Sequence, residues 1–198
     1  MKKVLIVATV QSHVAQFHKE FINILKKNGY IVEVAARNNL REKNGLSLVE
    51  PNKIYDIPFS RSPFGKSNVK AYKMLKEIIK TNSYDVIHCH TPMGGVLTRL
   101  AAKNVNAKSK VFYTAHGFHF YKGASLKNWL LYYPIEKRLS KYTDIIFTIN
   151  QEDFKIANEK FMSKKVIKTN GVVFNKKRLH CEKKLNWMSS FPQLRCHL

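Results

Sequence analysis

The chain alternates between short apolar runs and segments with helical periodicity. The first run, residues 3–10, is continuous, which is typical of a strand that a sheet buries on both faces. The runs predict strands at residues 3–10, 30–36, 54–57, 86–89, 110–114, 144–149 and 165–168. Because helical patterns separate most successive runs, the predicted fold class is α/β, a doubly wound Rossmann-like parallel sheet.

The helices are predicted from apolar residues spaced by three and four positions. Val14, Phe17, Phe21 and Leu25 indicate one amphipathic helix after the first strand, with Ser12 as its N-cap. Further helices are predicted at residues 69–79, from residue 92 onward, at 125–141 and at 151–161. Residues 37–52 are polar and predict a loop.

Two details of these helices are specific enough to be checked. The helix at 69–79 is expected to turn Val69, Tyr72 and Leu75 toward the core, together with the two isoleucines that follow. Pro134 lies inside the 125–141 pattern and is expected to kink or break that helix, because proline removes a helical hydrogen bond.

Four of the eight histidines fall at the ends of two predicted strands. His88 and His90 share one face of the first strand, with Cys89 on the other, while His116 and His119 follow the second. Ligands bind at strand carboxyl ends in open parallel sheets, so we expect some of these imidazoles to contact hydroxyl or phosphate groups. For His90 and His119 an ordinary hydrogen-bonded role stays equally open.

His116 is the strongest single candidate. It stands directly after a strand and before Gly117, and glycine at that position lets the backbone bend and a ligand approach closely. A neutral imidazole there can donate to or accept from a sugar hydroxyl.

The segment Pro92-Met-Gly94-Gly95 opens a helix whose first amides can hold an anion. Close packing of this helix on the sheet is the competing interpretation of the two glycines. Arg99 is predicted to be either a surface charge or a phosphate partner. The sequence contains no GxGxxG after the first strand, no GxxxxGK[ST] and no GxSxG, so dinucleotide, P-loop and serine-hydrolase motifs are unsupported.

The histidines also form a candidate zinc set, since His-x-His is followed by two more. No carboxylate lies near them in sequence, so neither a metal nor a cofactor is expected. A zinc-dependent hydrolase stays open as an alternative function.

The chain is strongly basic, with 35 Lys and Arg against 13 Asp and Glu and a net charge of +22. Such an excess attracts nucleic acid, anionic lipid or phosphorylated substrates, although a lysine-rich background composition explains it equally well. A basic module for anionic membrane or nucleic acid is therefore a second alternative. Because no recognition motif supports nucleic acid, that partner is not expected.

The three cysteines, Cys89, Cys181 and Cys196, form no CxxC pair and predict no disulfide framework, which favours a cytoplasmic location. No signal peptide is predicted, because the first apolar run is too short for an ordinary signal sequence and no small-residue cleavage pattern follows it. No membrane-spanning helix is predicted, because no apolar stretch approaches about 20 residues.

Three segments, residues 84–95, 113–123 and 129–137, together resemble the N-terminal domain of family 4 glycosyltransferases of the GT-B fold, of the bacterial capsular and exopolysaccharide type. The resemblance implies retaining transfer of a sugar from a nucleotide-sugar to a saccharide acceptor, often lipid-linked. It implies that His116 is the catalytic residue that reaches the reacting sugar. It also implies substrate contacts from Thr9, Gln11, Ser12, His13, His90, Gly94, Gly95, Gly117 and His119. Many members carry two glycines where this chain has Gln11 and Ser12, which puts phosphate contacts from that loop in doubt.

The resemblance covers residues 1–171, the expected acceptor-side domain, and fails over 172–198, where no hydrophobic period persists. We expect the chain to be a truncated or frameshifted product whose tail is out of frame. Family members continue into a donor-binding domain, so the nucleotide-sugar is expected to bind only where such a domain is supplied. The domain alone is expected to be inactive, and to contact the inner face of an anionic membrane peripherally.

Overall fold

The computed structural model describes residues 1–43 and 45–170, and its centre is a parallel sheet in the order β3-β2-β1-β4-β5-β6-β7. The strands are β1 Lys3–Val10, β2 Ile31–Arg37, β3 Lys53–Asp56, β4 Val86–His90, β5 Lys110–Ala115, β6 Ile145–Thr148 and β7 Lys165–Lys168. The predicted α/β class and its seven strands are confirmed. The order reverses between β1 and β4, which places a crevice outside the carboxyl ends of these two strands.

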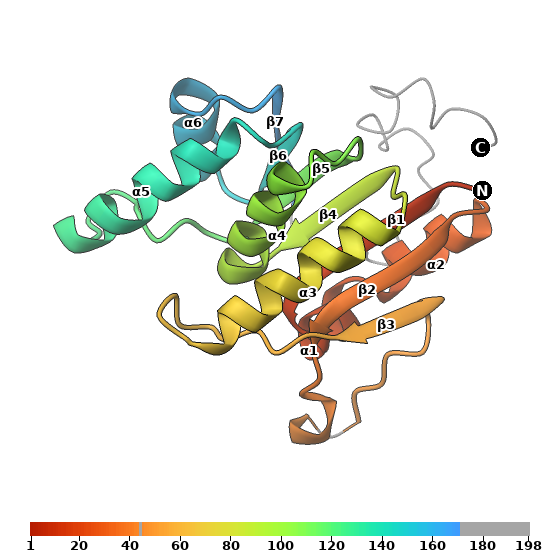
Figure 1. The fold of residues 1–198 in the computed structure, drawn as a ribbon. Helices are drawn as coiled ribbons and strands as arrows, with labels where there is room; N and C mark the ends of the chain where they lie inside the picture. The colour runs from red at the N-terminus through yellow and green to blue at the C-terminus, as the bar shows by residue number, and fades with distance from the viewer. Residues whose placement is uncertain (44, 171–198) are drawn as a thin grey trace.

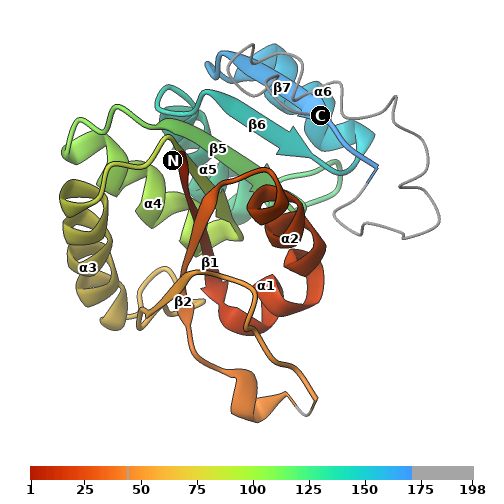
Figure 2. The same cartoon turned by 90° about the vertical axis from the view of Figure 1, so that its right-hand side faces the viewer.

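Helices cover both faces of the sheet (Figures 1 and 2). They are α1 Gln11–Phe17, α2 Lys19–Lys27, α3 Ser67–Thr81, α4 Pro92–Asn104, α5 Leu126–Ser140 and α6 Gln151–Lys160, with a short 3₁₀ helix at Leu40–Glu42. Side chains of α1 and α2 pack on one face, and those of α3 to α6 pack on the other. Coverage on both sides explains why the strands are apolar without alternation.

The helix predicted after β1 is in fact two helices. His18 separates them, with φ −121° and ψ 0°, so α1 ends at Phe17 and α2 begins at Lys19. The predicted N-cap is also wrong: Val10 occupies that position without a side-chain cap bond. Ser12 instead bonds Asn39, whose side chain accepts from the Ser12 amide at 3.0 Å and donates to its hydroxyl at 2.9 Å.

Two expectations about the other helices are corrected. Val69 is 61% exposed because it lies in the first turn of α3, at the edge of the core that Ala71 and Leu75 enter. Pro134 does not break α5, which runs unbroken to Ser140. Leu130, whose carbonyl loses its helical donor to the proline ring, is 78% exposed, so water can hydrate that carbonyl.

The expectations for residues 172–198, including Cys181 and Cys196, lie outside the described residues, as does the exact domain end at 171. Cys89 is buried and free. Within the described residues, no helix combines the length and apolar character that crossing a bilayer requires.

Candidate functional site

The ends of β1 and β4 are tied together at the point where the strand order reverses. The Thr9 amide donates to Thr91 Oγ1 at 3.1 Å, and the two threonine hydroxyls lie 2.6 Å apart. Thr91 has a φ of +64°, which is uncommon for a β-branched residue, and such backbone strain clusters at functional sites. This contact fixes the turn that carries His90 against the turn that carries His13.

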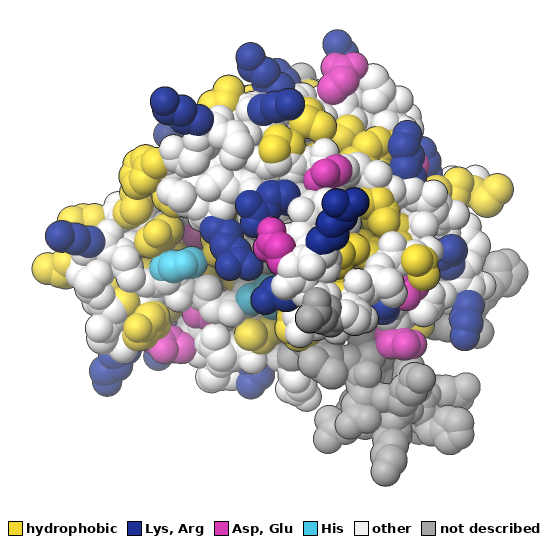
Figure 3. Space-filling view, turned by 90° about the horizontal axis from the view of Figure 1, so that it is seen from below, with side chains coloured by type: hydrophobic (Ala, Val, Ile, Leu, Met, Phe, Trp, Pro, Cys, Tyr) yellow, Lys and Arg dark blue, Asp and Glu magenta, His cyan; other side chains and the backbone are white. Residues whose placement is uncertain are grey.

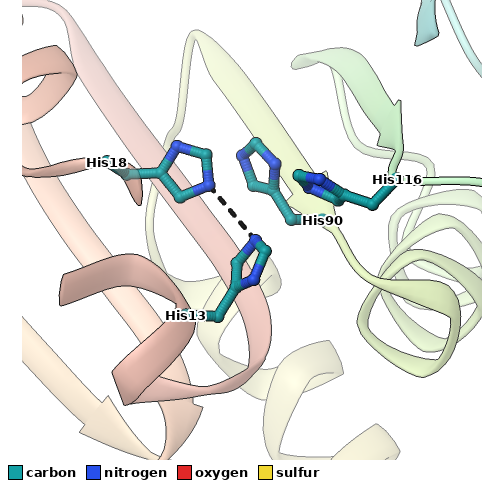
Figure 4. A group of neighbouring side chains, drawn as sticks. All are labelled: His13, His18, His90 and His116. Carbon is teal, nitrogen blue, oxygen red and sulfur yellow. Dashed lines mark hydrogen bonds between the residues drawn. The ribbon is translucent and has the colours of Figure 1, made fainter. Parts of the chain in front are cut away.

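Four histidines converge above this junction (Figure 4). His13 comes from α1, His18 from the α1–α2 break, His90 from the end of β4, and His116 from the residue after β5. One nitrogen from each ring lies within 4.8 Å of the others, and the Nε2 atoms of His13 and His18 are 3.4 Å apart. The rings of His18 and His90 have centroids 4.0 Å apart.

The cluster is buried and poorly supplied with partners. Both ring nitrogens of His90, which is 1% exposed, lack a hydrogen bond within residues 1–43 and 45–170, and so does Nε2 of His116. Burial and the neighbouring rings lower the pKa of His13 to about 4 and that of His90 well below its usual range. The imidazoles are therefore neutral at neutral pH, and their free nitrogens are available to a ligand.

His88 lies behind the cluster and has a partner of its own. Its Nε2 is 2.8 Å from Thr114 Oγ1, and burial lowers its pKa to about 3. The predicted alternation along β4 is confirmed, since Cys89 enters the core on the opposite face. His88 supports the His90 ring, with centroids 4.1 Å apart, and is a packing residue in this arrangement.

His119 does not join the other histidines. Gly117 has a φ of +118°, which turns the chain after His116. His119 then stacks on Tyr132 of α5 with ring centroids 4.4 Å apart. The Phe118 amide donates to buried Asp153 at 3.1 Å, which anchors the turn to the start of α6.

The remaining predicted contacts are mostly engaged within the protein. Gln11 is buried and its side-chain amide donates to the Ala36 carbonyl at 3.4 Å. The Gly95 amide donates to the Thr91 carbonyl. A Cβ on Gly95 would lie 2.5 Å from the ring of Tyr113. Close packing therefore accounts for this glycine, as it does for Gly94.

Two adjoining cavities lie on this edge of the sheet. The polar cavity, named for its hydroxyl, imidazole and cationic side chains, has a volume of about 460 Å³ and is lined in part by Thr9, Ser12, His13, Lys43 and Arg61. The other, of about 610 Å³, is mostly apolar and runs between α3, α4 and α5. They share five lining residues, Pro63, Pro92, Met93, His119 and Tyr132. In Figure 3, histidine side chains are visible at the surface near Lys and Arg side chains, and apolar side chains lie further along the same face.

Arg99 is neither a surface charge nor a phosphate partner. It is fully buried, and its guanidinium donates to Glu136 at 2.8 Å and to the Gly95 carbonyl at 2.9 Å, over the ring of Tyr113. This buried ion pair joins α4 to α5. The sequence did not indicate that Arg99 is buried in an ion pair, because its partner Glu136 lies 37 positions away in a different helix.

Sequence reasoning missed His18, Asn39, Lys43 and Arg61 as contributors to this region. His18 was assigned to a helix interior, and the two cations lie in polar loops without a distinguishing pattern. The sequence did contain one signal for the histidine cluster. His13 closely follows a predicted strand, and the carboxyl ends of parallel strands lie on the same edge of the sheet.

Comparison with solved structures defines the class of fold. The UDP-GlcNAc 2-epimerase from Neisseria meningitidis bound to UDP-GlcNAc superposes with a TM-score of 0.63 at 21% sequence identity, covering 84% of this chain and 45% of that one. At this identity the likeness shows the fold alone, one Rossmann-like unit of the kind found in GT-B glycosyltransferases and such epimerases.

Sequence comparison narrows the class to a family. Residues 3–150 match the family described as glycosyl transferase 4-like, and this chain belongs to that family. It is 50% identical over 154 residues to EpsD of Bacillus subtilis (strain 168), a candidate glycosyltransferase. It is 32% identical over 91 residues, 46% of this chain, to the UDP-Gal:α-D-GlcNAc-diphosphoundecaprenol α-1,3-galactosyltransferase of Escherichia coli. The EpsD match covers 77% of this chain but 39% of EpsD, and the other covers 22% of its relative.

Proposed function

We propose that residues 1–170 form the acceptor-side half of a retaining glycosyltransferase that acts in surface polysaccharide synthesis. In this proposal a sugar passes from a nucleotide-sugar to a lipid-linked saccharide. The donor binds a second domain, supplied on the same or a separate chain, and residues 1–170 alone do not carry the transfer.

The joined cavities are the observation that carries this proposal. An acceptor made of sugar, diphosphate and polyprenyl chain is polar at one end and apolar at the other. The polar cavity offers Lys43 and Arg61 to the phosphates, and arginine matches phosphate oxygens geometrically. The apolar cavity continues from it past Pro92 and Tyr132, and its lining of Phe, Val, Leu and Ile side chains suits hydrocarbon.

His116 is the proposed catalytic residue. It stands where β5 ends, half-buried, with an unpartnered Nε2, so its ring can bond the sugar that is transferred. Gly117, with its positive φ, leaves open space around its Cα for a ligand. Thr9, Ser12, His13 and His119 line the acceptor cavity, while Gln11, His90, Gly94 and Gly95 hold its walls.

The proposed location is the inner face of the cell membrane. Helix α5 exposes Leu126 and Leu130, at 79% and 78%, beside Lys127 and Lys137. A surface that mixes exposed leucines with lysines is suited to contact with anionic lipid.

Binding tests the acceptor assignment directly. A short polyprenyl diphosphate carrying N-acetylglucosamine is titrated into the purified protein. We expect Arg61→Ala to weaken binding by about 10–150-fold, since a hydrogen bond to a charged group contributes about 1.5–3 kcal/mol. Arg138→Ala, which removes an exposed arginine that lines neither cavity, is the matched control. Equal affinities for both variants would contradict the assignment.

Transfer tests the catalytic assignment. The protein is combined with a separately produced donor-binding domain of a close relative, and labelled sugar is followed into the lipid-extractable acceptor. We expect transfer only from the combination, with at least a 100-fold loss for His116→Ala, within the range that removing one positioned catalytic group produces. Transfer by the protein alone would overturn the proposed need for a second domain.

A further inference from the structure

We propose that His13, His18, His90 and His116 bind a single divalent transition-metal ion of the zinc class in a closed four-imidazole site. The four side chains reach one point from three separate parts of the sheet edge (Figure 4). The inference does not depend on the proposed transfer reaction, because it concerns only metal binding by residues within this domain.

The centre of the cluster holds ring nitrogens without a partner in the part of the chain that the structure describes. His90 is fully enclosed, yet neither of its nitrogens has a hydrogen bond to a described residue, and the same holds for His116 Nε2. Buried polar atoms are nearly always satisfied, so unpartnered atoms that face one another indicate a site for a ligand. The group contains four imidazoles and no carboxylate, which makes it rich in lone pairs and poor in donors.

All four rings are neutral imidazoles at neutral pH. Burial lowers the pKa of each, and neighbouring histidines add to this effect at His13, His18 and His90. Neutral imidazole is the form that coordinates a metal, and nitrogen ligands suit zinc, copper and nickel. An anion such as phosphate would gain little electrostatic binding energy at this site, because the rings are uncharged.

The distances between the ring nitrogens approach those of a tetrahedral metal site. A regular tetrahedron with zinc–nitrogen bonds of about 2.0–2.1 Å has nitrogen–nitrogen edges of about 3.4 Å. The Nε2 atoms of His13 and His18 already lie 3.4 Å apart. All four ligand atoms lie within 4.8 Å, so the most distant pair must approach by about 1.4 Å to reach the tetrahedral edge. His13 and His116 are half-buried and have room to make this adjustment.

The geometry also separates this site from a hydrolytic centre. Catalytic zinc usually keeps three protein ligands and an open position for water, whereas four protein ligands close the shell. A closed site would link α1, β4 and the β5 turn across the point where the strand order reverses. The ion reaches it through the polar cavity, which His13 lines.

A chelator competition titration tests the proposal. The purified chain is stripped with EDTA, and Zn²⁺ is added against a chromophoric chelator. We expect one tightly bound equivalent and a higher unfolding temperature with metal, because a ligand that binds the folded state stabilises it. Co²⁺ substitution should give the intense visible absorption of a tetrahedral ion.

Variants assign the ion to the cluster. His13→Ala and His116→Ala each remove a half-buried ligand, and we expect each to weaken Zn²⁺ binding at least about 100-fold, since losing even an outer-shell partner costs 10–100-fold. His119→Ala is the matched histidine control and should bind as the unmodified chain does. Cys181→Ser with Cys196→Ser removes the thiols of the tail and should also leave binding unchanged. Failure to bind one equivalent, or full binding in both ligand variants, would overturn the proposal.

Discussion

The buried pair between Arg99 and Glu136 offers the sharpest test of the packing that positions the site. Arg99 has no exposed surface, and among the described residues its carboxylate partner is the one on Glu136, 2.8 Å away. Burial disfavours its charge, but the Glu136 carboxylate outweighs this and raises the pKa of Arg99. The guanidinium therefore stays charged, and it needs its counter-charge.

The perturbation is Glu136→Gln, which keeps the volume and removes the charge. Breaking a buried pair by removing one partner costs about 3–5 kcal/mol, because it leaves an uncompensated charge. For a domain of this size we expect the unfolding temperature to fall by about 6–20 °C. Urea unfolding followed by circular dichroism should show a lower midpoint with an unchanged slope.

A second variant separates charge from packing. Arg99→Met with Glu136→Leu replaces both partners by apolar groups, and we expect it to be more stable than Glu136→Gln alone. Lys164→Gln removes the exposed member of a surface pair with Asp144 and should cost less than about 1 kcal/mol. A cost below about 1 kcal/mol for Glu136→Gln would refute the claim that Glu136 is needed to compensate the charge of Arg99. The ring of Tyr113 would then have to stabilise that guanidinium.

Three further predictions concern the site itself. The pKa of His88 falls from 6.5 in the unfolded chain to about 3, so stability is complete above pH 6.5 and declines as pH falls below it, by about 2 kcal/mol from this residue between pH 7 and pH 5. The buried histidines His13, His18 and His90 also have lowered pKa values and add to this loss. Urea unfolding in EDTA at the two pH values measures the combined loss, and a flat profile would contradict the assigned burial. Gly95→Ala should destabilise by about 1–3 kcal/mol through its clash with the Tyr113 ring, and a thermal melt that does not move would argue against that contact. Where an added donor domain restores sugar transfer, Zn²⁺ should slow the transfer and EDTA should reverse this effect, because the ion holds the His116 ring. A transfer rate that saturating Zn²⁺ does not change would mean that His116 is not both a metal ligand and the catalytic residue.

Much of the fold could be predicted because strands buried on both faces leave a plain trace in the sequence. The runs that became β1, β4 and β5 are mostly apolar, and their parallel order places the residues that follow them on one edge. That reasoning was sufficient to single out His90 and His116. The same reasoning placed His119 with them, which the positive φ of Gly117 and the stacking on Tyr132 prevent.

The rest depended on contacts between distant segments. The period of three and four continues through His18, so the sequence does not reveal the break there, and the backbone turns at that residue although no glycine or proline marks it. Partners such as Asn39 for Ser12 and Glu136 for Arg99 come from elements far along the chain. Propensity and periodicity report on neighbours a few positions apart, and tertiary packing overrides them at such sites.

The break at His18 also has a consequence for recognising related chains. On an uninterrupted helix, two residues five positions apart point about 140° away from each other, so His13 and His18 would not meet. The two rings converge because α1 ends at Phe17, so a pair of histidines at this spacing indicates that the helix is interrupted between them. A search for chains with His-x₄-His after the first strand, then His-x-His and a later His-Gly, should retrieve proteins that share this interrupted helix. An insertion or deletion of one residue between the two histidines would disperse the group while leaving the hydrophobic pattern almost unchanged.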